Sequence, residues 1–388
     1  MAEARRYTPR EMLEKLVSFD TTCTRSNLAL IDWVKDYLEG HGVECLVTPN
    51  AEGDKASLIA NIGPKVEGGV VLSGHTDVVP VEGQDWSRDP WTLTEENGRL
   101  YGRGACDMKA FDALALAIVP EALEAGLKRP IQLALSYDEE DGMWGAPPMI
   151  ERLAAELPRA SAVVVGEPSR MAVVGAHKGI LELIVRVKGF ETHSSIRHTG
   201  VSAVHLAARL VTWLDDRQDE NIARPLPGAE LFDPPCTSLH VGEFQGGEAH
   251  NITAGRAWFS VDVRACPPET SAQWLDAIRK EAARLEAQAQ KIRPEARIEI
   301  EVKADVPPCA PEDQGEAESL LRALTGDNAP NAVSYATEAG LFQAAGYSTA
   351  VCGPGDIAQA HQPDEYIEIA QLDAGEAFMK RLVEKLSA

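Results

Sequence analysis

Five potential metal ligands, two histidines and three carboxylates, stand in short polar motifs of this chain. They are His75 in SGHTD, Asp107 in GRGACDMK, Glu140 in YDEEDG, Glu167 in GEPS and His361 in AHQPDE. Imidazole nitrogens and carboxylate oxygens suit zinc, cobalt or manganese. One carboxylate can bridge two ions, so five residues can give each ion three protein ligands and leave positions for water and substrate. The set predicts a two-metal centre that activates water.

Two further carboxylates extend the predicted centre. Asp77 lies two residues after His75, where it could accept the imidazole N–H that is not needed for metal. Glu139 precedes Glu140 at the end of a buried strand, where two like charges repel unless a cation is near. Their side chains point different ways, so Glu140 can bind metal while Glu139 acts as general base toward an attacking water. Taken singly, each histidine of the set would be a structural residue and each carboxylate a solvated charge. Together they favour a catalytic centre.

The elements that must position these residues alternate between strand and helix over the first 180 residues. Buried strands are expected within 68–77, 131–140 and 161–169, and a helix over 108–126. Hydrophobicity is continuous along the strands, which is typical of an α/β sheet that is covered on both faces and mostly parallel. Each strand runs directly into polar residues at its carboxyl end, where ligand sites gather in open α/β sheets.

The pattern changes after Gly179. Alternating strands are expected at 180–189, 257–264 and 296–305, and amphipathic helices near 201–216 and 270–290. Alternation indicates a sheet with one face open to solvent, and hence a small α+β insert. We predict a discontinuous catalytic domain, residues 1–178 and 307–388, interrupted by a lid domain, residues 179–306.

The bulk composition limits the partners. The 388 residues include 37 basic and 60 acidic side chains, a net charge of −23 that repels phosphate backbones, so we expect no nucleic-acid partner. No stretch reaches the roughly 18 apolar residues that would span a membrane. The N-terminus predicts a helix with Thr8 and Glu11 in a capping box and Pro9 at its first position, not a signal peptide, so we expect a cytoplasmic protein.

Other chemistries lack their motifs. The seven cysteines form no CxxC pair, which argues against a disulfide framework and against a thiolate metal site. A Rossmann oxidoreductase would need GxGxxG after its first strand, and a serine hydrolase would need a nucleophile elbow. Neither motif is present.

Eight motifs occur in an order that resembles a known family. They are SGHTDVVP, GRGACDMKAFDA, SYDEEDG, GEPSRMAVVGAHKG, HSS, AHN, DVR and GPGDIAQAHQPDEY. Together they resemble the dizinc amidohydrolase family that contains acetylornithine deacetylase, succinyl-diaminopimelate desuccinylase and carboxypeptidase G. The resemblance implies a phosphorylase/hydrolase-like catalytic domain with a mostly parallel sheet, interrupted by an α+β lid and dimerisation domain.

The resemblance also implies roles for the residues. One Zn²⁺ would be held by His75, Asp107 and Glu167, and the other by Asp107, Glu140 and His361, with Asp107 bridging. Asp77 would orient His75, and Glu139 would be the general base. Co²⁺ is a possible substitute for zinc.

For the lid, the family implies a homodimer with a shared active site. His193 would reach the active site of the other subunit and polarise the scissile carbonyl. Asn251 and Arg264 match lid positions that hold a substrate carboxylate.

The implied reaction is hydrolysis of the amide bond of an N-acyl amino acid. The motifs are most similar to those of acetylornithine deacetylases, which implies N-acetyl-L-ornithine as substrate and a place in arginine biosynthesis. Glu338, in YATEAG, could then meet the ornithine ammonium, or be a solvated loop residue. The alternatives are another N-acyl amino acid deacylase, a succinyl-diaminopimelate desuccinylase or a dipeptidase, and, in a different class, a non-catalytic binding protein.

Overall fold

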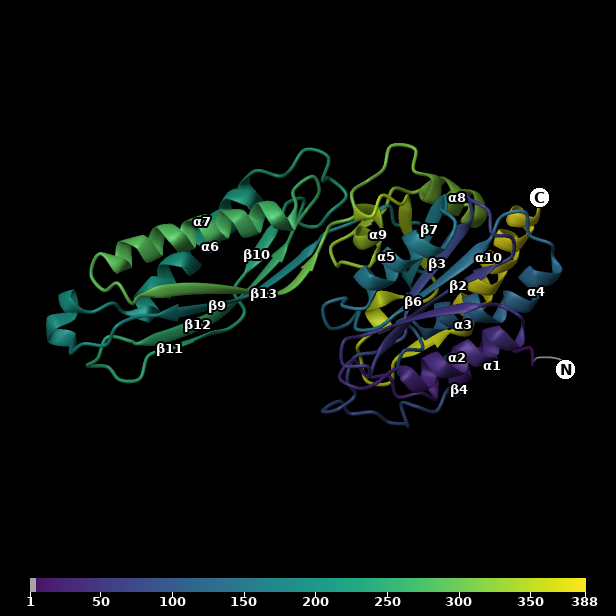
Figure 1. The fold of residues 1–388 in the computed structure, drawn as a ribbon, viewed down its shortest axis with the longest axis horizontal. Coiled ribbons are helices and arrows are strands. Elements are labelled where there is room, and N and C mark those ends of the chain that lie inside the picture. Colours follow the sequence, from purple (N-terminus) through teal and green to yellow (C-terminus); the bar gives the residue numbers. More distant parts are fainter. Residues whose placement is uncertain (1–4) are drawn as a thin grey trace. The chain divides into compact units, whose positions relative to one another are not determined.

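The computed structural model describes residues 5–388, which form two compact units. Unit 1 contains the chain up to Ala176 together with Pro311–Asn331 and Thr337–Ala388. Unit 2 contains His177–Ala310 and the short segment Ala332–Ala336. The chain thus builds one unit from distant segments and inserts the other between them (Figure 1).

A six-stranded sheet forms the centre of unit 1, with strand order β1-β2-β6-β3-β7-β15. The strands are β1 (Cys45–Pro49), β2 (Ala56–Ile62), β3 (Val70–His75), β6 (Ile131–Ser136), β7 (Ala162–Pro168) and β15 (Thr349–Gly353). Four strands that are consecutive in the sheet, β6, β3, β7 and β15, run parallel to one another, and every residue in them is buried. The mostly parallel α/β sheet predicted from the continuous apolar runs is confirmed.

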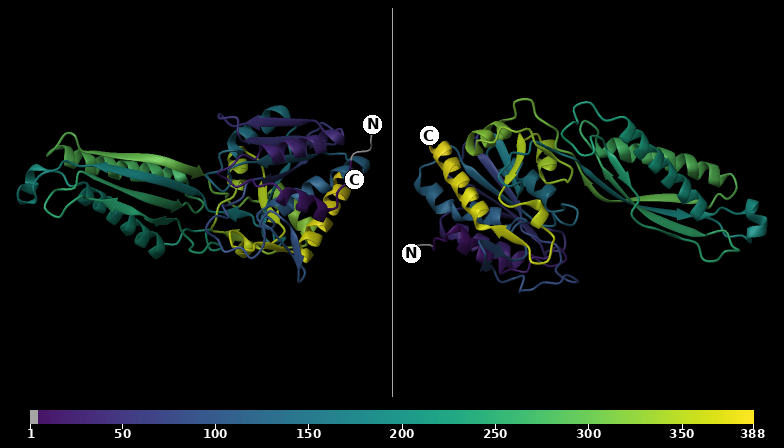
Figure 2. Two further views of the ribbon diagram at one scale, coloured as in Figure 1. Left: turned by 90° about the horizontal axis from the view of Figure 1, so that it is seen from below. Right: turned by 180° about the vertical axis from the view of Figure 1, so that it is seen from behind.

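Helices pack on both faces of this sheet. They are α1 (Pro9–Val17), α2 (Leu28–Gly40), α3 (Lys109–Ala117), α4 (Val119–Glu124), α5 (Ala146–Glu156), α8 (Glu316–Thr325), α9 (Ala339–Ala344) and α10 (Ile369–Ser387). The pair α1 and α10, far apart in sequence, pack together and against α3 (Figure 2). The predicted capping box of the first helix is present at Thr8 and Glu11.

One predicted helix is wrong in detail. Residues 108–126 form two helices, α3 and α4, rather than one. Pro120 stands in the first turn of α4 and has no N–H to donate to the preceding turn, so the hydrogen-bond ladder is interrupted there. The apolar pattern runs through the break, which is why the sequence suggested a single helix.

Several smaller elements complete the description. A three-stranded sheet contains β4 (Thr94–Glu96), β5 (Arg99–Tyr101) and β16 (Tyr366–Glu368), and η2 (Ile357–Gln359) is a short 3₁₀ helix. The two-residue strands β8 (Ala176–His177) and β14 (Ala332–Val333) pair with each other. In the part of the chain that is described, no helix is long and apolar enough to cross a membrane.

Unit 2 is a five-stranded antiparallel sheet with two long helices. Its elements are β9 (Ile180–Lys188), η1 (Ser194–Thr199), α6 (Ala203–Ala223), β10 (Ser238–His240), β11 (Phe244–Gly246), β12 (Arg256–Arg264), α7 (Ser271–Gln290) and β13 (Arg297–Val306). Alternate residues of β9 point into a core that is shared with α6 and α7, as predicted. They are Leu181, Leu183, Val185 and Val187. The opposite face of the sheet is exposed, as expected for an α+β insert.

A candidate metal centre at the carboxyl ends of the central strands

The five predicted ligands converge in unit 1. His75 ends β3, Glu167 lies near the end of β7, and the other three stand in loops at the same edge of the sheet. Nε2 of His75 lies 3.1 Å from Oδ1 of Asp107 and 3.7 Å from Oε1 of Glu167. Nε2 of His361 lies 3.3 Å from Oδ2 of Asp107 and 3.0 Å from Oε1 of Glu140. Asp107 therefore stands between two imidazoles and presents a different oxygen to each.

The hydrogen bonding of His75 favours a cation beside its Nε2. Nδ1 lies 2.9 Å from the backbone carbonyl oxygen of Asp77, to which it can donate its proton. In that neutral tautomer Nε2 carries a bare lone pair, yet it faces carboxylate oxygens of Asp107 and Glu167. Three electron-rich atoms facing one another repel unless a proton or a metal ion lies between them.

The electrostatics of the cluster lead to the same conclusion. Burial alone would lower the pKa of His75, but the adjacent Asp107 and Asp77 carboxylates outweigh it and raise that pKa well above its ordinary value. Contacts with Asp107 and Glu140 raise the pKa of His361 to about 10. Both histidines thus lie where positive charge is strongly favoured.

The acids show the complementary effect. Desolvation, reinforced by the charge of Asp107, raises the pKa of Glu140 to about 7 and that of Glu167 well above its usual value. Burial would also raise the pKa of Asp107, but its two histidine neighbours lower it. Oε1 of Glu167 is buried and has no hydrogen-bond donor among residues 5–388. An acceptor left without a donor in a negative cluster fits a metal ligand, so the residues present suit two divalent cations.

Glu139 lies beside the cluster. One carboxylate oxygen of Glu139 is within 4.8 Å of the ligand atoms of His75 and Glu167, and an oxygen of Glu140 is equally close to His75 and Asp107. Desolvation raises the pKa of Glu139 well above its usual value, and the charge of Glu140 adds to the effect. A carboxylate whose pKa is raised in this way is a better proton acceptor than an ordinary glutamate, as a general base requires.

Asp77 differs from the prediction in the atom it uses. Its carboxylate is 3.6 Å from Nδ1 of His75, whereas its backbone carbonyl oxygen is at 2.9 Å. The backbone carbonyl of Asp77, rather than its carboxylate, is therefore the closer acceptor for the Nδ1 proton of His75. The carboxylate instead accepts the backbone N–H groups of Glu139 and Glu140, each at 3.1 Å. Asp77 therefore fixes the loop that carries the two glutamates as well as the histidine.

Glu338 lies in a different environment from the loop expected for it. It directly precedes α9, is only 1% exposed, and accepts a hydrogen bond from Oγ of Ser73 at 3.2 Å. Desolvation raises its pKa to about 7. The interpretation as a solvated residue is wrong, because the side chain is enclosed beside β3.

The three predicted residues of unit 2 fall into two places. His193 precedes η1, with Nδ1 2.8 Å from Oγ of Ser195, and the backbone N–H of Ser194 donates to the carbonyl oxygen of Asn251 at 2.9 Å. The exposed His193 and Asn251 loops are thus neighbours. Arg264 stands at the far end of β12, where its Nε pairs with Asp262 at 3.0 Å.

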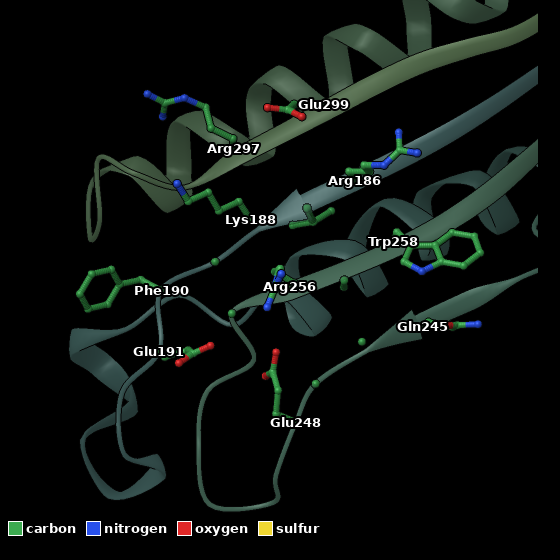
Figure 3. A pocket seen from close by; sticks show the side chains of 16 residues that line it. Arg186, Lys188, Phe190, Glu191, Gln245, Glu248, Arg256, Trp258, Arg297 and Glu299 are labelled. Atoms are coloured by element: carbon green, nitrogen blue, oxygen red, sulfur yellow. The ribbon is translucent and has the colours of Figure 1, made fainter.

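The open face of the unit 2 sheet carries a hollow of about 800 Å³. Arg256, Lys188 and Arg297 stand side by side there on three neighbouring strands (Figure 3). Glu191, Glu248 and Glu299 also line the hollow, so its charge is mixed. The hollow contains none of the predicted metal ligands, all of which belong to unit 1.

Two residues that the sequence reasoning assigned no role also border the centre. Arg103 and Glu365 are fully buried and form an ion pair between the segments that carry Asp107 and His361. A signal was present, since Glu365 follows His361 by four residues within the quoted motif AHQPDEY.

Known proteins with the same pattern were found by sequence and by structure. The profile of peptidase family M20/M25/M40 matches residues 71–385. The acetylornithine deacetylase of Myxococcus xanthus is 37% identical over 386 residues, covering 96% of each chain. The acetylornithine deacetylase of Proteus mirabilis (strain HI4320) is 33% identical and covers 94% of this chain and 92% of its own. The M20 family metallo-carboxypeptidase Sso-CP2 of Sulfolobus solfataricus shares the fold, with a TM-score of 0.77, 18% identity and coverage of 98% and 99%.

Proposed function

Because this chain belongs to peptidase family M20/M25/M40, we propose that it is a metal-dependent amidohydrolase that converts N-acetyl-L-ornithine into L-ornithine and acetate. The observation that carries the proposal is Asp107, which stands between two imidazoles in a cluster of desolvated acids. Near-full-length similarity to acetylornithine deacetylases supports the choice of substrate.

In this proposal the ligands divide into two sets that share Asp107. His75, Asp107 and Glu167 would hold one Zn²⁺, and Asp107, Glu140 and His361 the other, with Co²⁺ as a substitute. When bound, the two ions would supply Lewis acidity for the acyl carbonyl and make water acidic enough to attack at neutral pH. Asp77 would hold the Glu139–Glu140 loop in register with His75.

The chain's own groups move the proton. Glu139 takes a proton from the attacking water as the C–O bond forms, and delivers it to the amine nitrogen as the C–N bond breaks. The products are a carboxylate and a free amine. His193 of the partner subunit would stabilise the developing oxyanion, and Asn251 and Arg264 would hold the substrate carboxylate.

The same proposal covers the organisation of the protein. Residues 1–178 and 307–388 would form the catalytic domain, and residues 179–306 the lid through which two chains dimerise. We further propose a cytoplasmic location and a role in arginine biosynthesis.

A panel of substrates tests the proposed function. Metal-free enzyme is reconstituted with Zn²⁺ or Co²⁺, and release of free amine is measured from acetyl, succinyl and formyl amino acids and from dipeptides. N-acetyl-L-ornithine should have the highest kcat/KM, and the enzyme without added metal should be inactive. A preference for succinyl-diaminopimelate or for a dipeptide would make that compound the proposed substrate instead. Absence of turnover with any compound would favour a binding protein.

Glu338 provides a sharper test of side-chain recognition. Because the side chain is enclosed and its Oε2 accepts from Ser73, we expect Glu338→Gln to change kcat/KM for acetylornithine and for uncharged acetylmethionine by the same factor. If the carboxylate instead met the ornithine ammonium, its loss would remove a charge-assisted hydrogen bond of about 1.5–3 kcal/mol. A rise in KM of about tenfold or more for acetylornithine alone would restore the substrate-binding role.

A further inference from the structure

A buried ion pair joins two segments of unit 1 that carry proposed metal ligands. Nη1 of Arg103 donates to Oε2 of Glu365 at 2.7 Å, and neither residue is more than 1% exposed. The two residues are 262 positions apart in sequence. The pair therefore forms only when the segment before α3 and the segment before β16 meet.

Glu365 organises the backbone that leads to Asp107. Its Oε1 accepts the N–H groups of Cys106 at 2.8 Å and of Asp107 at 3.0 Å. Its Oε2 accepts the N–H of Gly104 at 3.1 Å in addition to the arginine. A carboxylate offers about four acceptor positions. In Glu365 they are filled by the backbone N–H groups of Gly104, Cys106 and Asp107 and by the guanidinium of Arg103.

Arg103 extends the network to His361. Its Nη2 donates to Oε1 of Gln84, and Nε2 of Gln84 donates to the backbone carbonyl oxygen of His361 at 2.9 Å. Nη1 of Arg103 also reaches the carbonyl oxygen of Gln362 at 3.4 Å. One connected set of hydrogen bonds thus fixes the backbone of both ligands.

The backbone of His361 requires such support. Its φ is +61°, in the left-handed region that non-glycine residues seldom adopt. Such a conformation persists where the surrounding contacts hold it, and these positions gather at functional sites. The hydrogen bond from Nε2 of Gln84 to the carbonyl oxygen of His361 is one contact that holds this conformation.

Stability alone is a poor explanation for the pair. Apolar residues of similar volume often replace a buried ion pair without loss of stability, whereas they cannot orient backbone N–H groups. We propose that Arg103 and Glu365 are positioning residues that hold Asp107 and His361 in a metal-binding arrangement. This inference rests on the proposed metal centre.

The test measures metal binding directly. Metal-free wild type and Glu365→Gln are titrated with Zn²⁺ against a chelating dye, and with Co²⁺ by its visible absorption. Glutamine keeps the shape but offers one acceptor oxygen in place of two. The groups bonded to the lost oxygen, either the N–H groups of Cys106 and Asp107 or those of Gly104 and Arg103, are left without their acceptor. We expect zinc affinity to fall about 10- to 100-fold, the usual effect of losing an outer-shell partner, and the Co²⁺ spectrum to change. Glu365→Asp should recover part of the affinity.

A matched control separates positioning from general stability. Glu312, also in unit 1, accepts the backbone N–H of Thr349 at 3.2 Å and the amide of Gln343 at 3.1 Å, away from the proposed ligands. Glu312→Gln should weaken the fold in denaturant unfolding while its zinc affinity stays that of wild type. If Glu365→Gln does not fold, Arg103→Lys is measured in its place, because lysine keeps the charge but lacks the planar fork whose two nitrogens bond Glu365 and Gln84 separately.

The outcomes distinguish the two proposals. Failure of the wild type to bind two metal ions would overturn the proposed metal centre. Normal metal binding by the wild type, with unchanged zinc affinity and Co²⁺ spectrum in Glu365→Gln or Arg103→Lys, would overturn the positioning role alone.

Discussion

Replacing Glu139 with glutamine is expected to lower kcat by at least about 100-fold while both metal ions stay bound. The carboxylate lies within 4.8 Å of the ligand atoms of His75 and Glu167, and desolvation raises its pKa well above the ordinary value. Glutamine keeps the shape but cannot take a proton from water. Turnover and metal content of the purified variant are the two measurements.

The neighbouring residue supplies the control for this variant. Glu140→Gln should lose one equivalent of metal, because Glu140 contacts His361 at 3.0 Å and is a proposed ligand. Near-normal turnover in Glu139→Gln, or loss of a metal ion from it, would show that the roles proposed for the two glutamates are wrong.

Mixing two inactive variants should restore activity if the active site is shared. His193→Ala and Glu139→Gln are each expected to be nearly inactive. If His193 acts in the other subunit, a mixed dimer has one site with both defects and one with neither. Random reassembly of equal amounts makes about half the dimers mixed, so about a quarter of all sites should recover.

The readout is specific activity after co-refolding, compared with each parent refolded alone. Differently tagged subunits must first be recovered in one complex, because failure to exchange would imitate a negative result. With exchange demonstrated, a mixture as inactive as its parents would show that His193 serves its own chain.

The proximity of the five ligand candidates could be predicted because parallel strands end at one edge of a sheet. His75 and Glu167 lie on β3 and β7, which are hydrogen-bonded neighbours, so their motifs had to meet. The alternation along Leu181–Val187 likewise required one wet and one buried face. In both cases a local periodicity determines a long-range arrangement.

Other features depended on details that local patterns do not encode. Asp77 presents its carbonyl oxygen to His75 because its carboxylate is used by the backbone N–H groups of Glu139 and Glu140, which lie 62 and 63 positions away in sequence. Glu338 lies in the loop before α9 as expected, but the sequence does not show that the side chain is buried there rather than solvated. Arg103 and Glu365 each lie in a motif that carries a proposed ligand, but their pairing spans 262 positions and no local pattern links the two motifs.

The parallel pairing of β15 with β7 has a consequence for how the chain folds while it is being translated. The whole of unit 2 is translated between these two strands, so the edge of β7 stays without its partner while the ribosome makes the insert. An unpaired apolar edge is a template for pairing with other chains. The nascent protein is therefore most exposed to misassembly during this interval, when unit 2 can already fold but unit 1 is incomplete.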